Sequence, residues 1–194
     1  MKTLELNPRA IKHFLDMRIT LPKSLLKVMG VGIFVALTAI GAYIRVPLFF
    51  TPVPLTMQTF FVLLSGAILK KKYGSISQSL YVVLGVVGLP IFAGGVSGLG
   101  VILGPTGGYL ISFILASFIL GTLLEKSEYS LSQLIILFTS VMLFILTLGS
   151  LWIMVFLRVS MGQAFILGFV PFLIGGILKS LLAATIYDKL KHKF

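Results

Sequence analysis

Long apolar segments separated by short breaks fill the chain from about residue 25 to residue 188. The breaks are lysine clusters, prolines or runs of glycine, all of which interrupt a continuous apolar helix. A helix needs about 20 mostly apolar residues to cross the hydrocarbon core of a bilayer. We therefore predict an all-α integral membrane protein with six transmembrane helices. The expected spans are about 25–45, 55–69, 75–92, 107–124, 131–157 and 171–188.

The composition agrees with this pattern. Hydrophobic residues make up 58% of the 194 residues, and the mean hydropathy of +1.11 is far above that of a soluble domain. No stretch resembles a soluble domain or a linker, so residues 1–194 are expected to form one membrane domain. Residues 1–24 are more polar, and Asn7 with Pro8 can start a short helix on the cytoplasmic membrane surface. That segment is either a simple anchor or a docking site for a partner.

Basic residues predict the topology. All but three of the 16 Lys and Arg residues fall in segments that are cytoplasmic if the N-terminus is inside; the exceptions are Arg45, Arg158 and Lys179. Cytoplasmic loops of membrane proteins carry an excess of Lys and Arg. Both termini are therefore expected in the cytoplasm. The same distribution explains the net charge of +11 through membrane topology and lipid contact rather than nucleic-acid binding.

The three predicted outer loops are apolar, whereas most loops are polar. Loop 46–54 contains three prolines and two phenylalanines, loop 93–108 is rich in glycine, and loop 158–170 is mostly apolar. Irregular backbone at membrane depth is tolerated where it packs into protein or lines a cavity. We therefore expect ordered, glycine-rich outer loops that cover a ligand pocket open to the outside.

Lys179 is the most unusual residue inside a predicted span. The five acidic residues all lie in predicted cytoplasmic segments or at a membrane edge, so no span holds a carboxylate that could neutralise Lys179. A charge in hydrocarbon costs at least about 2.5 kcal/mol, and such charges usually pair or mark a functional site. Either the lysine meets the carboxylate of a bound small molecule, or it extends to a membrane interface.

The sequence lacks the residues of a catalytic, metal or ATP-binding site. It has no GxxxxGK[ST] phosphate loop, no cysteine and no HExxH motif, and its two histidines, His13 and His192, lie near the termini. No enzyme, metal or cofactor is therefore expected. The absence of an acid from the spans argues against coupling to protons or sodium through a carboxylate. What remains is typical of a binding protein.

Several neutral residues are candidate ligand contacts with a structural alternative. Gly94 and Gly95 can expose backbone amides to a ligand or simply form tight turns. Trp152 is either an anchor at the membrane interface or an aromatic wall for a ligand. Gln58 and Tyr81 can bind a ligand or hydrogen-bond to neighbouring helices.

Five stretches of the sequence resemble one known family. They are 44–60 (IRVPLFFTPVPLTMQTF), 81–95 (YVVLGVVGLPIFAGG), 98–110 (GLGVILGPTGGYL), 149–152 (GSLW) and 171–179 (PFLIGGILK). The stretches run through most of the chain and resemble the signature of the BioY family, the biotin-specific S component of energy-coupling factor (ECF) transporters. The combination of TPVPLTMQTF with LGPTGGY is highly specific for this resemblance.

The resemblance implies six helices with both termini inside and an outward-facing biotin pocket, in a prokaryotic cell membrane. It also implies assembly with a transmembrane coupling subunit and two cytoplasmic ATPase subunits. Small residues of the first helix, Gly32, Ala36 and Ala39, would contact the coupling subunit. The spacing of small residues alone fits internal helix packing equally well, and a free-standing biotin carrier is the alternative to an assembly.

One position departs from the family motif, which reads proline-phenylalanine-x-x-glycine-aspartate-x-x-lysine. Gly175 and Lys179 match, but Gly176 stands at the position of the aspartate. In the family, that carboxylate is expected to accept bonds from the ureido N–H groups of biotin, and its loss removes about 1.5–3 kcal/mol. Either backbone carbonyls near Gly176 substitute for it, or the ligand is another carboxylate-tailed vitamin without a ureido, such as lipoate.

Overall fold

A computed structural model describes residues 22–125 and 128–191, and the regular secondary structure of this part is helical apart from one short β-hairpin. The helices are α2 (Lys23–Tyr43), α3 (Gln58–Val86), α4 (Leu99–Leu103), α5 (Gly107–Glu125), α6 (Leu131–Leu157), α7 (Met161–Gly168) and α8 (Val170–Leu190). The expected surface segment at residues 1–24 lies almost wholly outside the described residues.

Four helices of the described chain are long and apolar enough to cross a membrane: α2 from Ser24 onward, α5, α6 and α8. Their bounds agree closely with the predicted spans 25–45, 107–124, 131–157 and 171–188. The two other predicted spans, 55–69 and 75–92, both fall largely within α3.

Helix α3 is a tight hairpin of two helices that meet at Lys70. The backbone there is not helical (φ 63°, ψ −178°). Gln58 Nε2 donates to the Tyr81 hydroxyl at 2.7 Å, and Gln78 Nε2 donates to Ser65 Oγ at 3.0 Å. Because these partners lie at similar distances before and after Lys70, the two halves run antiparallel. They are about 18 Å and 24 Å long, each shorter than a bilayer core of about 30 Å.

The predicted boundaries in this region are wrong at three places. The first half begins at Gln58 rather than at 55, because Leu55 and Thr56 form strand β2. The second half continues directly after Lys70 rather than starting at 75. It ends at Val86 rather than at 92, since Gly88 adopts a positive φ of 115° that a helix does not allow.

Close backbone packing joins the hairpin to α5. A Cβ atom on Gly66 would lie 2.7 Å from the carbonyl oxygen of Ser117, and one on Gly121 would lie 2.3 Å from the Lys71 nitrogen. Ser65 Oγ also lies 3.1 Å from Ser117 Oγ. Small residues permit such close contact between helices in lipid, where packing and polar contacts drive helix association.

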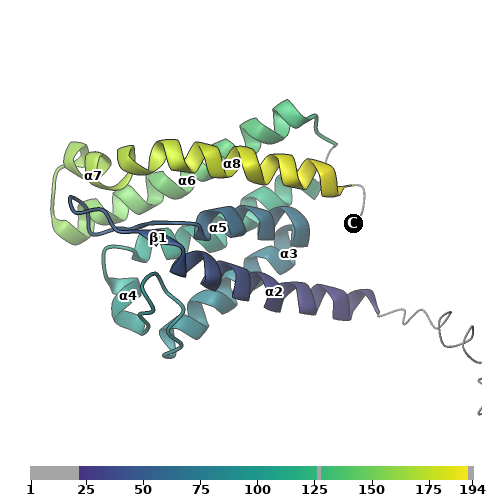
Figure 1. Cartoon of the computed structure of the whole chain (residues 1–194), viewed down its shortest axis with the longest axis horizontal. Coiled ribbons are helices and arrows are strands. Elements are labelled where there is room, and N and C mark those ends of the chain that lie inside the picture. The colour runs from purple at the N-terminus through teal and green to yellow at the C-terminus, as the bar shows by residue number, and fades with distance from the viewer. Residues whose placement is uncertain (1–21, 126–127, 192–194) are drawn as a thin grey trace, which may run out of the picture.

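The helices pack in the order α2, α3, α5, α6 and α8, with α3 between α2 and α5. Figure 1 shows α4, α7 and strand β1 gathered at one end of the bundle, and the start of α2 and the end of α8 at the other. Strands β1 (Arg45–Val46) and β2 (Leu55–Thr56) pair antiparallel, with Arg45 opposite Thr56. The loops at 93–108 and 158–170 are more regular than the sequence predicted, because they contain α4 and α7.

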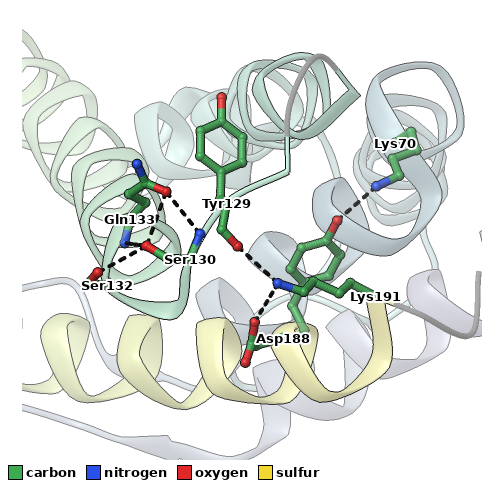
Figure 2. A network of polar contacts seen from close by, with 8 residues as sticks. Lys70, Tyr129, Ser130, Ser132, Gln133, Asp188 and Lys191 are labelled. Carbon is green, nitrogen blue, oxygen red and sulfur yellow. Dashed lines mark hydrogen bonds and ion pairs between the residues drawn. The ribbon is translucent and has the colours of Figure 1, made fainter.

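Polar side chains close the end of the bundle where α8 terminates (Figure 2). Lys191 Nζ donates to the Tyr129 carbonyl at 2.9 Å and pairs with Asp188 at 2.8 Å. Lys70 Nζ donates to the Tyr187 hydroxyl at 2.9 Å. These contacts tie α8 to the α3 turn and to the segment that leads into α6. The end that carries α4, α7 and the β-hairpin is built differently and contains the candidate site.

Candidate ligand-binding site

A cavity of about 390 Å³ lies beneath the β-hairpin and α4. Its walls come from the hairpin and the start of α3 (residues 45–59), from α4 and the segment before it, and from the first turns of α5. One residue of α6, Leu146, and two residues of α8, Phe172 and Lys179, complete the lining. Small-molecule sites are usually mostly apolar cavities of about 300–1,000 Å³ with a few polar groups. The size and composition of this cavity fit that class.

The proline-rich loop 47–54 covers the cavity because its ends and its middle are held in place. Val53 is buried, and its N–H donates to Thr51 Oγ1 at 3.3 Å. After the loop, the Met57 N–H donates to the carbonyls of Gly41 and Ile44 at the end of α2. Prolines in the loop restrict its backbone and remove N–H groups that would otherwise need partners.

Lys179 reaches the cavity from α8, and its side chain contacts the start of α3. Its Nζ donates to the Thr56 carbonyl at 2.9 Å. A lysine ammonium has three donors, so this neutral carbonyl leaves two of them available. None of the described residues that line the cavity is acidic, and the lining contains one other cation, Arg45. The cavity is therefore suited to an anionic or strongly polar ligand.

Gln58 also lines the cavity, and its amide is fixed from two sides. Nε2 donates to the Tyr81 hydroxyl at 2.7 Å, while Oε1 accepts from Thr56 Oγ1 at 3.0 Å. Tyr81 itself is fully buried behind the lining and donates to the Ile91 carbonyl at 2.9 Å. Its ring packs edge-on against Phe92, a lining residue, with centroids 5.6 Å apart. Tyr81 thus positions Gln58 and the segment after α3.

Three further predicted contacts lie beside the cavity rather than in its lining. Gly94 and Gly95 follow the lining residue Ala93 and adopt positive φ values of 94° and 73°. Gly176 is buried against α6, where an added Cβ would lie 3.1 Å from Met142 Cγ. A side chain at position 176 would therefore project toward α6.

Trp152, the remaining predicted contact, also lies outside the lining. Its indole Nε1 donates to the Gly104 carbonyl at 2.8 Å, which holds the end of α4 against α6. A Cβ on Gly108 would lie 2.2 Å from the Trp152 Cβ. The indole thus packs tightly where the glycine-rich segment meets α5. Among the seven predicted contact residues, the structure brings Lys179 and Gln58 together in the lining.

Sequence reasoning did not select several residues that line the cavity. Thr59 is buried, and its Oγ1 has no hydrogen-bond partner among the described residues. Tyr109 and Phe172 form an aromatic pair with centroids 6.3 Å apart. Arg45 was used only to predict topology. The signals were weak, because hydroxyls and aromatics in a span usually serve the helices themselves.

The fold and this site define a membrane protein with a small-molecule pocket at one end of a helical bundle. The family model of BioY matches residues 15–194, and the chain belongs to the BioY family. Named members of this family are transporters rather than enzymes.

Two relatives and one solved structure are similar over most of their length. The chain is 44% identical to a probable biotin transporter BioY of Pyrococcus horikoshii, over 83% of this chain and 93% of the relative. It is 43% identical to the biotin transporter BioY of Thermotoga maritima, over 82% and 92%. A crystal structure of the S-component for biotin from an ECF-type ABC transporter superposes with a TM-score of 0.81. That structure is 27% identical, and the match covers 88% of this chain and 93% of the other.

Proposed function

We propose that this chain is the substrate-binding S component of an ECF-type vitamin transporter and that it captures biotin in the cavity beneath the β-hairpin. The observation that carries the proposal is the ammonium of Lys179 in a cavity whose described lining contains no acid. Membership of the BioY family supports biotin as the ligand, since relatives of this chain are named biotin transporters.

The lining has groups for each part of biotin, which combines a carboxylate tail with a neutral ring that carries N–H donors and a carbonyl. The cations Lys179 and Arg45 suit the carboxylate or the ring carbonyl. The Thr56 carbonyl can accept a bond from an N–H group. Apolar and aromatic side chains such as Phe113 suit the hydrocarbon part.

The absence of an acid from the described lining makes lipoate the second candidate ligand. Lipoate has a carboxylate tail but no ureido, so it needs no acceptor for N–H groups. Biotin remains the first candidate because a neutral acceptor, the Thr56 carbonyl, is present and relatives of this chain are named biotin transporters.

A six-helix topology follows if the two halves of α3 each count as a crossing beside the four long helices. An even number of crossings agrees with Figure 1, in which α2 begins and α8 ends at the same end of the bundle. The excess of lysines assigns that end to the cytoplasm. The cavity then opens toward the outside, where a vitamin is captured.

The outward face of α2 is the proposed docking surface for a transmembrane coupling subunit. Gly32 and Ala36 are exposed and Ala39 is half-buried. A Cβ on Gly32 would meet no atom within 4 Å. Only 28% of the most apolar stretch of α2 is buried, against 61% for α5. The small residues therefore leave room for a second helix to approach closely.

Uptake against a gradient is expected to need partner subunits. The sequence contains no phosphate loop. The carboxylates of the long helices, Glu125 and Asp188, lie at helix ends and pair with Lys71 and Lys191. Reconstituted alone in liposomes, the protein should bind labelled biotin without concentrating it. Addition of a coupling subunit and two ATPase subunits should produce ATP-dependent accumulation of the label inside the liposomes. Concentrative uptake by the isolated chain, with or without an ion gradient, would instead support the free-standing carrier.

A further inference from the structure

We propose that Arg45 is the residue that binds the carboxylate of the ligand, as a second cationic anchor at the edge of the cavity. The inference rests on the proposed function and deepens it, because it assigns one end of the ligand to one side chain. Arg45 enters the lining from strand β1, whereas Lys179 enters it from α8. The two cations therefore reach the cavity from separate secondary-structure elements.

The guanidinium of Arg45 is available to a ligand. The described part of the chain has two ion pairs, Lys71–Glu125 and Lys191–Asp188, and Arg45 takes part in neither. No side-chain hydrogen bond of Arg45 to another described residue is present either. An arginine has five N–H donors in a rigid planar fork. All of them remain free for water or for a bound molecule.

The guanidinium of Arg45 lies close to the backbone of Gly94. A Cβ on Gly94 would lie 2.9 Å from Arg45 Cζ and closer still to Nη1, so the glycine lets the guanidinium lie directly against the loop backbone. Gly94 also adopts a φ of 94°, which other residues rarely tolerate. The Arg45 side chain is thus seated on the loop that precedes α4. This contact holds the cation at the edge of the cavity.

The chemistry of the surroundings favours a carboxylate at Arg45. The planar fork matches the two oxygens of a carboxylate with two parallel bonds. Arg45 is exposed, so a carboxylate bound there keeps part of its hydration and avoids the full penalty of burial. The Lys179 ammonium already donates to the Thr56 carbonyl, and a neutral acceptor beside it suits a ring that carries both a carbonyl and N–H donors.

Titration with biotin and with biotinamide, which differ only in the charge and hydrogen bonding of the tail, tests the assignment. Arg45→Gln should weaken biotin binding by about 10-fold or more, the effect of losing a charged hydrogen bond, and change biotinamide binding less than about twofold. Arg45→Lys should retain part of the affinity for biotin. Arg158→Gln is the matched control, because Arg158 is the other predicted outer arginine and does not line the cavity.

Each other outcome contradicts the inference. If Arg45→Gln lowers the affinity for both ligands equally, or for neither, Arg45 does not bind the carboxylate. A loss confined to biotin in Lys179→Ala, with Arg45→Gln unchanged, would move the carboxylate to Lys179. Thermal unfolding of each variant shows whether it is folded. If Arg45→Gln is misfolded, the affinities of Arg45→Lys for biotin and biotinamide are compared instead. If the wild-type protein binds neither ligand, the proposed function itself fails, and this result is distinct from the other three.

Discussion

Lys179→Ala is expected to weaken biotin binding by about 2 kcal/mol or more, roughly 30-fold, since hydrogen bonds to charged groups contribute about that much. The Lys179 ammonium lies in the cavity with one neutral partner, the Thr56 carbonyl, so a polar ligand group gains a strong bond there. Calorimetry on the purified protein measures the effect. Lys189→Ala is the control, because Lys189 is exposed in the last turn of the same helix.

The same variant should not lower the melting temperature of the ligand-free protein. Lys179→Ala removes the bond to Thr56, but it also removes a half-buried cation that no described acid neutralises. The two changes have opposite effects on the free energy of unfolding. An unchanged affinity for biotin would show that the ammonium only supports the β-hairpin and does not meet the ligand.

Ala36→Trp is expected to abolish assembly with the coupling subunit and therefore ATP-dependent uptake. Ala36 lies on the exposed face of α2, one turn from Gly32, where a large side chain would keep a second helix from close approach. Affinity for biotin in detergent should stay near that of the wild type, because α2 residues 23–43 do not line the cavity. Co-purification with the coupling subunit and uptake by reconstituted liposomes are the measurements.

Ile136→Trp is the matched control for this variant, since Ile136 is an exposed residue of α6 and is 65% accessible. It should permit both assembly and uptake. If Ala36→Trp lowers biotin affinity and assembly together, the small residues of α2 serve internal packing. The docking surface would then have to lie on another helix.

The four long helices could be predicted from the sequence because uninterrupted apolar runs leave the backbone no partner in lipid except its own helix. The α3 hairpin could not be predicted in the same way. Lys70, Lys71 and Lys72 indicated a polar loop, whereas the structure turns at Lys70 alone. At this turn Lys71 closely approaches Gly121 of α5. A contact between residues so distant in the sequence gives no signal in local hydropathy.

The residues of the candidate site could be predicted from the sequence only in part, for a related reason. Lys179 was identifiable because the spans contain no acid to pair with it, an argument that needs charge alone. Thr59 and Arg45 could not be identified in this way. A threonine in a span usually bonds to its own helix, and an arginine in an outer loop is an ordinary surface charge. The fold brings them to one cavity. Trp152 and Tyr81, by contrast, are positioned behind the lining by the bonds to Gly104 and Ile91.

Calorimetric titration of the purified wild-type protein with biotin and with lipoate tests the central claim most directly. The account predicts direct, saturable and tight binding of biotin at one site per chain. Lipoate should bind more weakly, because it has no N–H group to donate to the Thr56 carbonyl. Lipoate binding well ahead of biotin would assign the cavity to the second candidate. Binding of neither vitamin would contradict the proposal that this chain captures a vitamin.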